Sequence, residues 1–445
     1  ENGAKPQDSD PTSEELQTII NFYTQGQLEQ ALSHATAMLE RFPNSAVLYN
    51  IVGASNAGLM QLGAAIDSYK HALQIKPDYA EVYRNMGDVL KDSNDLKAAI
   101  DSYKEATLIK PDFAEAYNSL GIALKKRGDL AEAINCYRQA ISLKTDYADV
   151  YYNLGNALKD KGDLEMAIDS YKQAVIIKPD YTDAYNNMGN SLQDMGDLQA
   201  AIDVYKQAIK ITPDHAGVYN NMGAALKDKG DLDAAIDSYI QAIKIMPDHA
   251  EAYNNMGFAL NGKGDPDAAI DSLKHALRIN PDYAEAYNNM GIAQNDNGDL
   301  EAAIGSYKQA LKIKPDYAEA YNNMGIAQND NGDLEAAIGS YKQALKIKPD
   351  YAEAYNNMGV ALMDKGDLDA AIDSFKQSLK IKPDYAEAYN NMGAALFGMG
   401  ELKAALDSYN QALKIKPDSQ VSLAGKFHLQ SHICDWAGLE QDRDL

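Results

Sequence analysis

The stretch AEAYNNMGIAQNDNGDLEAAIGSYKQALKIKPDY, residues 284–317, decides the fold because the chain repeats it. The same 34 residues recur unchanged at 318–351, and looser copies extend in both directions at the same spacing. Self-similarity at this period is typical of helix-turn-helix units that stack into a solenoid. In such a chain each repeat contacts only its neighbours, so the repeats form one quasi-linear array.

Within this stretch we expect two helices separated by a short turn. The first runs over about residues 284–297. Gly298 and Asp299 end it, because glycine suits the position just past a helix and aspartate can cap the next one. The second helix runs over about residues 300–314, and Pro315 stops it because proline has no N–H.

The spacing of residues predicts which faces of these helices pack in the core. At 100° per residue, Tyr287, Met290 and Gly291 form one stripe on the first helix, with Gln294 at its edge. We expect Gly291 to be bare so that a neighbouring helix can approach closely. On the second helix small and large residues share one stripe, as stacked helices require: Ala303, Tyr307, Ala310 and Leu311.

The proline near the end of each repeat, or threonine in one of them, recurs at a step of 34 residues without insertion, which gives twelve repeats. The predicted fold class is therefore all-α, a right-handed α-solenoid (superhelix) of twelve helix-turn-helix repeats plus a C-terminal capping helix. We expect three parts: a disordered leader at 1–11, the repeats at 12–419, and a capping helix with the start of a further region at 420–445.

Composition excludes several classes of function. The chain has 41 basic and 65 acidic residues, a net charge of −24, whereas nucleic-acid binding favours a basic stripe. Cys136 and Cys434 are far apart and have no metal-ligand spacing. No apolar run approaches the roughly 18 residues of a membrane span, and the start of the sequence has no signal-peptide pattern. We expect no nucleic-acid, membrane, metal or cofactor binding, and a cytoplasmic location.

A row of asparagines marks the candidate binding site. Seven consecutive repeats carry an Asn-Asn pair on the first helix, on the side opposite the core stripe. An amide offers two donors and an acceptor, so a spaced row can pair with the main chain of an extended peptide whatever its sequence. The predicted peptide-binding residues are the second asparagine of each pair and its equivalents: Asn85, Asn153, Asn187, Asn221, Asn255, Asn289, Asn323, Asn357 and Asn391.

Other interpretations of these asparagines stay open. The second asparagine could instead bond to the adjacent repeat and set the superhelical twist, which would not prevent peptide binding. The first asparagine of each pair is interpreted as solvated polar surface. Acidic residues stand four positions before most of the predicted binding residues, as Glu285 does before Asn289, and would bias the choice of peptide. Gly425 takes the place that follows Asn391 and would end the row.

The pattern Tyr-x-x-Met-Gly-x-x-Leu … Ala-x-x-x-Tyr-x-x-Ala … Pro resembles that of the tetratricopeptide repeat (TPR). The asparagine row and the tail from Phe427 to Trp436, which contains Ile-Cys-Asp-Trp, together resemble protein O-linked N-acetylglucosamine transferases and SPINDLY-type relatives. In that family an inner asparagine ladder of a long TPR superhelix binds substrate polypeptides. His428 and His432 favour a capping helix over a metal site, because no further ligand is arranged around them.

The resemblance implies a substrate-recognition arm whose catalytic region is absent from this sequence. We then expect no catalytic residues in the chain, flexible or extended protein segments as its partners in the concave groove, and room for a homodimer through the convex face. The alternative is a free-standing scaffold for protein–protein interaction with no link to glycosylation.

Overall fold

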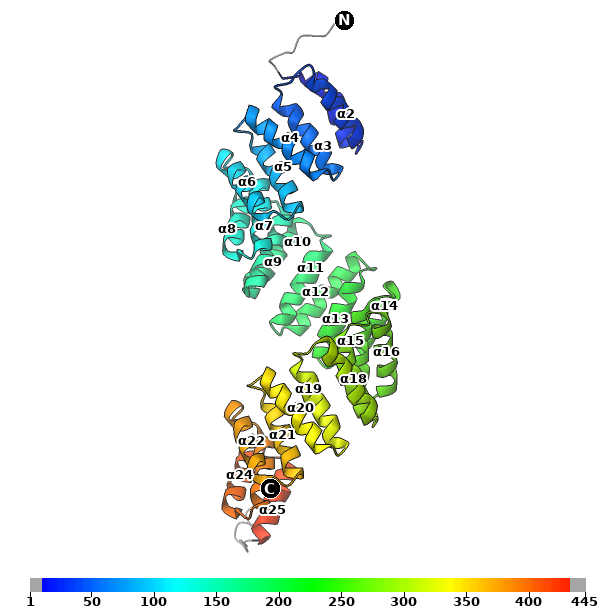
Figure 1. Cartoon of the computed structure of the whole chain (residues 1–445), viewed down its shortest axis with the longest axis vertical. Coiled ribbons are helices and arrows are strands. Elements are labelled where there is room, and N and C mark those ends of the chain that lie inside the picture. Colours follow the sequence, from blue (N-terminus) through cyan, green and yellow to red (C-terminus); the bar gives the residue numbers. More distant parts are fainter. Residues whose placement is uncertain (1–9, 433–445) are drawn as a thin grey trace. The chain divides into compact units, whose positions relative to one another are not determined.

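The computed structural model describes residues 10–432, which form 25 α-helices and no strand (Figure 1). The predicted all-α solenoid class is confirmed. Most of the predicted leader and the Ile-Cys-Asp-Trp part of the tail lie outside the described residues. None of the described helices is long and apolar enough to cross a membrane.

The chain divides into two compact halves, Glu1–Pro213 and Asp214–Leu445. The helices of the N-terminal half are α1 (Ser13–Thr24), α2 (Leu28–Leu39), α3 (Ala46–Gly58), α4 (Leu62–Ile75), α5 (Ala80–Asp92), α6 (Leu96–Ile109), α7 (Ala114–Arg127), α8 (Leu130–Leu143), α9 (Ala148–Lys161), α10 (Leu164–Ile177), α11 (Thr182–Asp194) and α12 (Leu198–Ile211). The helices of the C-terminal half are α13 (Ala216–Asp228), α14 (Leu232–Ile245), α15 (Ala250–Gly262), α16 (Pro266–Ile279), α17 (Ala284–Asp296), α18 (Leu300–Ile313), α19 (Ala318–Asp330), α20 (Leu334–Ile347), α21 (Ala352–Asp364), α22 (Leu368–Ile381), α23 (Ala386–Gly398), α24 (Leu402–Ile415) and α25 (Gln420–His432).

The helix ends follow the predicted signals. Helices α17 and α18 each end one residue before the predicted boundary. Gly298 adopts a left-handed φ of 82°, and the Asp299 carboxylate accepts a hydrogen bond from the N–H of Ala302 at 3.1 Å. The turn between the two helices of a repeat is therefore built by its own residues.

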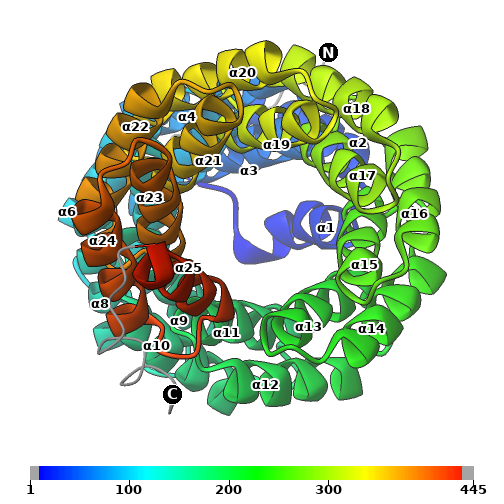
Figure 2. The same cartoon turned by 90° about the horizontal axis from the view of Figure 1, so that it is seen from below.

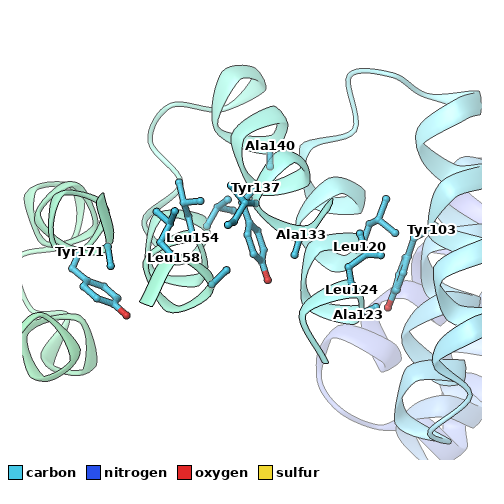
Figure 3. Packing of buried hydrophobic residues seen from close by; sticks show 14 of the residues in the cluster. Tyr103, Leu120, Ala123, Leu124, Ala133, Tyr137, Ala140, Leu154, Leu158 and Tyr171 are labelled. Carbon is cyan, nitrogen blue, oxygen red and sulfur yellow. The ribbon is translucent and has the colours of Figure 1, made fainter. Parts of the chain in front are cut away.

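The core of most repeats contains a tyrosine packed against a glycine. Tyr307 of α18 is 2% exposed and lies across the bare backbone of Gly291 on α17, where an added Cβ would come within 2.6 Å of the ring. The predicted close approach at Gly291 is confirmed, and its partner is the second helix of the same repeat. Figure 3 shows the equivalent Tyr137 of α8 beside Leu154 and Leu158 of the next repeat.

First and second helices take opposite sides of the stack. In Figure 2 the first helices of the C-terminal half (α13, α15, α17, α19, α21 and α23) lie on the inner side of that half, and the second helices lie outside them. Helices α9 and α11 of the N-terminal half are likewise inside α10 and α12. The side chains of the first helices therefore form an inner face within each half.

Helix α25 follows the last repeat and covers it. It packs on α23 and α24, and its Leu429 is fully buried against them. Gly425 lets α25 approach, since a Cβ there would lie 2.6 Å from the ring of Tyr409. A thirteenth first-helix position is thus filled without a second helix among the described residues.

Candidate functional site

The nine predicted binding residues, here called the ladder asparagines, all lie on first helices and are all half-buried. Most of them hydrogen-bond to the preceding repeat. In the C-terminal half five of these bonds run from the ladder Nδ2 to the Oδ1 of an asparagine 35 residues earlier: Asn255 to Asn220 at 3.0 Å, Asn289 to Asn254 at 2.9 Å, and Asn323 to Asn288, Asn357 to Asn322 and Asn391 to Asn356, each at 3.1 Å.

The N-terminal half follows the same rule with local variations. Asn85 donates to Asn50 at 3.1 Å, and Asn153 donates to Asn118 at 3.1 Å. For Asn187 the residue 35 positions earlier is Tyr152. The Asn187 amide donates to the Tyr152 hydroxyl at 3.1 Å and to Asn156 at 2.9 Å. Each of these amides therefore joins one repeat to the one before it.

The residues that accept these bonds, here called the supporting asparagines, are mostly the first members of the Asn-Asn pairs. Their interpretation as solvated surface is wrong in the C-terminal half, where Asn220, Asn254, Asn288, Asn322 and Asn356 are at most 6% exposed. Their side chains lie in the contact with the first helix of the next repeat. The apolar stripe of a single helix does not predict this contact, because the contact lies between two repeats. A buried amide there needs a partner, and the ladder asparagine supplies it.

Bonding between repeats leaves part of the amide available in Asn323, Asn357 and Asn391. An asparagine has two N–H donors and two lone pairs on its oxygen. Asn323 uses one N–H on Asn288, and its oxygen accepts only a long bond of 3.5 Å from Asn322. Asn357 and Asn391 are arranged in the same way, with bonds of 3.4 Å inside the pair. Each of these three amides therefore keeps one N–H and one oxygen lone pair that no other described residue occupies.

The acidic residues beside the ladder are mostly paired. Glu285 contacts Lys314 at 3.3 Å, and the Lys314 ammonium lies 4.5 Å from the ring centre of Tyr317. Burial, together with Glu285 and Glu319, raises the pKa of Tyr317 to about 12. The same acid–lysine pair recurs at Glu319–Lys348 and Glu353–Lys382. These glutamates are thus partly neutralised, which weakens the predicted charge bias.

The place three residues after each ladder asparagine differs between the halves. In the N-terminal half Asp88, Asn156 and Asn190 accept hydrogen bonds from the core tyrosine hydroxyls at 2.6–2.8 Å. In the C-terminal half this place is apolar throughout: Ala224, Phe258, Ile292, Ile326, Val360 and Ala394. Phe258 is 45% exposed, and Ile292, Ile326 and Val360 are half-buried.

The row ends at the capping helix. Ser422 of α25 donates to the Oδ1 of Asn390 at 3.2 Å, so a serine fills the role that a ladder asparagine has elsewhere. Gly425, which follows Asn391 in the repeat register, carries no side chain to continue the row. Sequence reasoning missed Ser422, because it lies three residues before the repeat position.

Arg84 is a second residue that sequence reasoning missed. It replaces a supporting asparagine, donates to the Oδ1 of Asn85 at 2.9 Å and pairs with Asp88 at 3.5 Å. Arg84 and Asn85 line a pocket of about 290 Å³ with the exposed side chains of Ile20 and Tyr23. The sequence signal for this site was the arginine at position 84, where most repeats have asparagine.

Residues 10–432 contain no group of three or more His, Cys, Asp or Glu side chains that could hold a metal. His428 and His432 stand together, with ring centres 4.8 Å apart, against Phe397 of α23. The histidine pair thus contributes to the docking of α25, as the capping-helix interpretation expects.

Comparisons with known proteins identify the repeats. Family models described as TPR repeat match 61–93, 87–128, 123–161, 155–196, 189–230, 293–332 and 327–366, and models described as tetratricopeptide repeat match 214–282, 272–305 and 350–418. The comparison with curated proteins gave no match.

Among solved structures the chain is similar to one described as the APC/C hetero-tetramer Cut9-Hcn1. The identity is 15%, the TM-score is 0.48, and the match covers 92% of this chain and 88% of that one. Two structures of MamA are 32% and 31% identical, each with a TM-score of 0.34. They cover 37% and 39% of this chain and 97% and 94% of their own.

Proposed function

The chain belongs to the tetratricopeptide repeat family, whose solenoids bind protein partners, and we propose that this one binds extended protein segments along its inner face. The observation that carries the proposal is the spare donor and acceptor on Asn323, Asn357 and Asn391. An extended main chain presents an N–H and a C=O at almost every residue, so this pair fits it regardless of side chains.

Affinity would build by repetition along the ladder. A single hydrogen bond contributes only about 0.5–1.5 kcal/mol net, so one repeat alone would bind weakly. Several repeats in register would add such increments and would select long, unstructured segments over short or folded ones. The partly neutralised glutamates leave little charge preference to oppose this.

Two matched variants separate binding from stability. Changing Asn323, Asn357 and Asn391 to alanine removes three ladder amides, whereas changing Asn288, Asn322 and Asn356 to alanine removes their supports. Both variants break the same three hydrogen bonds between repeats. Any loss of stability that arises from those bonds is therefore common to both.

The measurement is the affinity for a panel of unstructured Ser/Thr-containing peptides, by fluorescence anisotropy, with helicity checked by circular dichroism. We expect the ladder variant to bind at least about tenfold more weakly than the parent, a loss of about 1.4 kcal/mol. The support variant should keep most of the affinity. Equal losses in both variants would make the ladder a structural device and would contradict the proposal.

As a finer proposal, the bound segments are acceptors of a protein O-linked N-acetylglucosamine transferase. The asparagine row in register over nine repeats and the Ile-Cys-Asp-Trp tail support it through resemblance. Excess chain added to such a transferase should then compete for protein acceptors, and the ladder variant should not. Competition that is equal for both variants, or absent for both, would favour a scaffold unrelated to glycosylation.

A further inference from the structure

We infer that the inner face of the C-terminal half binds its ligand as a polyproline II segment, with three ligand residues per repeat. The inference rests on the proposed function and adds a conformation, a period and a ligand class. The ligand class is an unstructured segment in which proline recurs at every third residue.

The distance between neighbouring repeats sets the period that a ligand must match. The first helices of neighbouring repeats contact each other directly, as α15 contacts α17 and α17 contacts α19. Helices in contact lie about 8–10 Å apart. The hydrogen bonds from Asn323 to Asn288 and from Asn357 to Asn322 have the same length, so neighbouring first helices are joined in the same way from repeat to repeat.

An extended ligand must match that step with residues that face the same side. In a β-strand the next residue on the same face lies only about 6.6–6.8 Å away, and a residue three positions along the strand faces the opposite side. A polyproline II helix has three residues per turn and rises about 3.1 Å per residue, so every third residue returns to one face after about 9.3 Å. The repeat step therefore matches polyproline II.

The chemistry of each step agrees with that register. A ladder amide offers one N–H and one lone pair, which fit the C=O and the N–H of a single ligand residue. The two residues between such contacts need no free N–H. Proline lacks an N–H and prefers the φ of polyproline II, so it fits those two places and no others.

Side chains beside the ladder asparagines supply a surface for the ligand residues that lie between two ladder contacts. Phe258, Ile292, Ile326 and Val360 lie three residues after a ladder asparagine, about one turn further along the same helix, and are exposed or half-buried. Proline-rich segments dock on aromatic-lined grooves, and their preformed conformation loses little entropy on binding. Phe258 supplies an aromatic ring, and the three aliphatic side chains add apolar surface at the same place in the following repeats. Asp88, Asn156 and Asn190 hold this place in the N-terminal half, so the preference is assigned to the C-terminal half.

The test compares peptides of about 18 residues, the length that six repeats would hold at three residues each. One peptide has six prolines at every third position. A second has the same composition, with the six prolines divided evenly among the three possible phases, so that every register loses about a third of its N–H contacts. A third peptide has no proline.

We expect the phased peptide to bind about tenfold more tightly than the unphased one. Replacing Ile292 and Ile326 by asparagine, the residue at positions 156 and 190, should reduce that preference. If the proline-free peptide binds but the phased peptide binds no more tightly than the unphased one, the polyproline II inference is wrong and the proposed function stands. If none of the three peptides binds, both the inference and the proposed function fail.

Discussion

Glycine has two distinct roles in one repeat, and they predict opposite effects of the same substitution. An added Cβ at Gly291 would lie 2.6 Å from Cε1 of Tyr307, whereas at Gly305, on exposed α18 surface, it would meet nothing within 4 Å. Gly291→Ala should destabilise by about 1–3 kcal/mol through overpacking. Gly305→Ala should stabilise by about 0.5–1 kcal/mol because alanine favours a helix. Urea unfolding followed by circular dichroism measures both, and a shift in the same direction would contradict this account.

The tyrosine hydroxyls predict a stabilising change. Tyr205 donates to Asn190 at 2.6 Å, but the buried hydroxyl of Tyr239 has no partner among the described residues, because Ala224 stands at the equivalent place. Ala224→Asn should supply one and raise stability by about 1 kcal/mol, less a few tenths for helix propensity. Ala224→Val, which cannot accept a hydrogen bond, is the control. Equal melting temperatures for the two variants would show that a hydrogen bond from the Tyr239 hydroxyl does not stabilise the fold.

Residue by residue, the sequence predicted the core better than the site. Gly291 and Tyr307 follow from the periodicity of one repeat. The burial of Asn288 could not be predicted that way, because it depends on a contact with the next first helix, which has no signature of its own in the sequence. Ser422 was missed for a related reason, since α25 continues the stack with a different residue register.

At the scale of single elements, α25 stabilises one end of the C-terminal half. Leu429 is fully buried against α23 and α24, whereas Val421 on the same helix is 68% exposed. Leu429→Ala should cost about 2–5 kcal/mol locally. Because repeats couple mainly to their neighbours, hydrogen exchange should accelerate in α23–α25 and not in α17–α19. Val421→Ala is the control. Faster exchange throughout the half would show a more cooperative unit than a repeat array.

The helix boundaries themselves were predictable to within a residue or so. Gly298, Asp299 and Pro315 act through local backbone chemistry, so the turn and the ends of α17 and α18 need no tertiary information. The repeat period then carried those boundaries along the chain. The histidines His215 and His249, at places where other repeats have tyrosine, add caps that the period did not predict, with Nδ1 accepting from the main chain at 3.2 and 3.3 Å.

Over the whole molecule, the half-buried tyrosines predict alkaline instability. Burial, followed by nearby glutamates, raises the pKa of Tyr283, Tyr317, Tyr351 and Tyr385 to about 12. In the unfolded chain tyrosine loses its proton near pH 10. Between about pH 10 and 12 the unfolded state therefore binds fewer protons than the folded state, so the free energy of unfolding falls as pH rises.

Tyrosinate absorbance and far-ultraviolet circular dichroism, recorded together against pH, measure this. We expect a large part of the absorbance change to lag behind the ordinary tyrosine titration and then to rise together with the loss of helicity. Complete titration of the tyrosines near pH 10 with helicity retained would show that their burial does not control the alkaline limit.

We expect the inner face to bind the main chain of its ligand rather than its side chains. We would measure the affinity of the chain for one unstructured peptide without proline, for a version with scrambled sequence, and for a version with N-methylated amides. We expect equal affinity for the first two peptides and at least about tenfold weaker binding of the third, because N-methylation removes the N–H groups from which the ladder oxygens would accept hydrogen bonds. Retained binding of the N-methylated peptide, with loss on scrambling, would show that the face reads side chains and would contradict the claim.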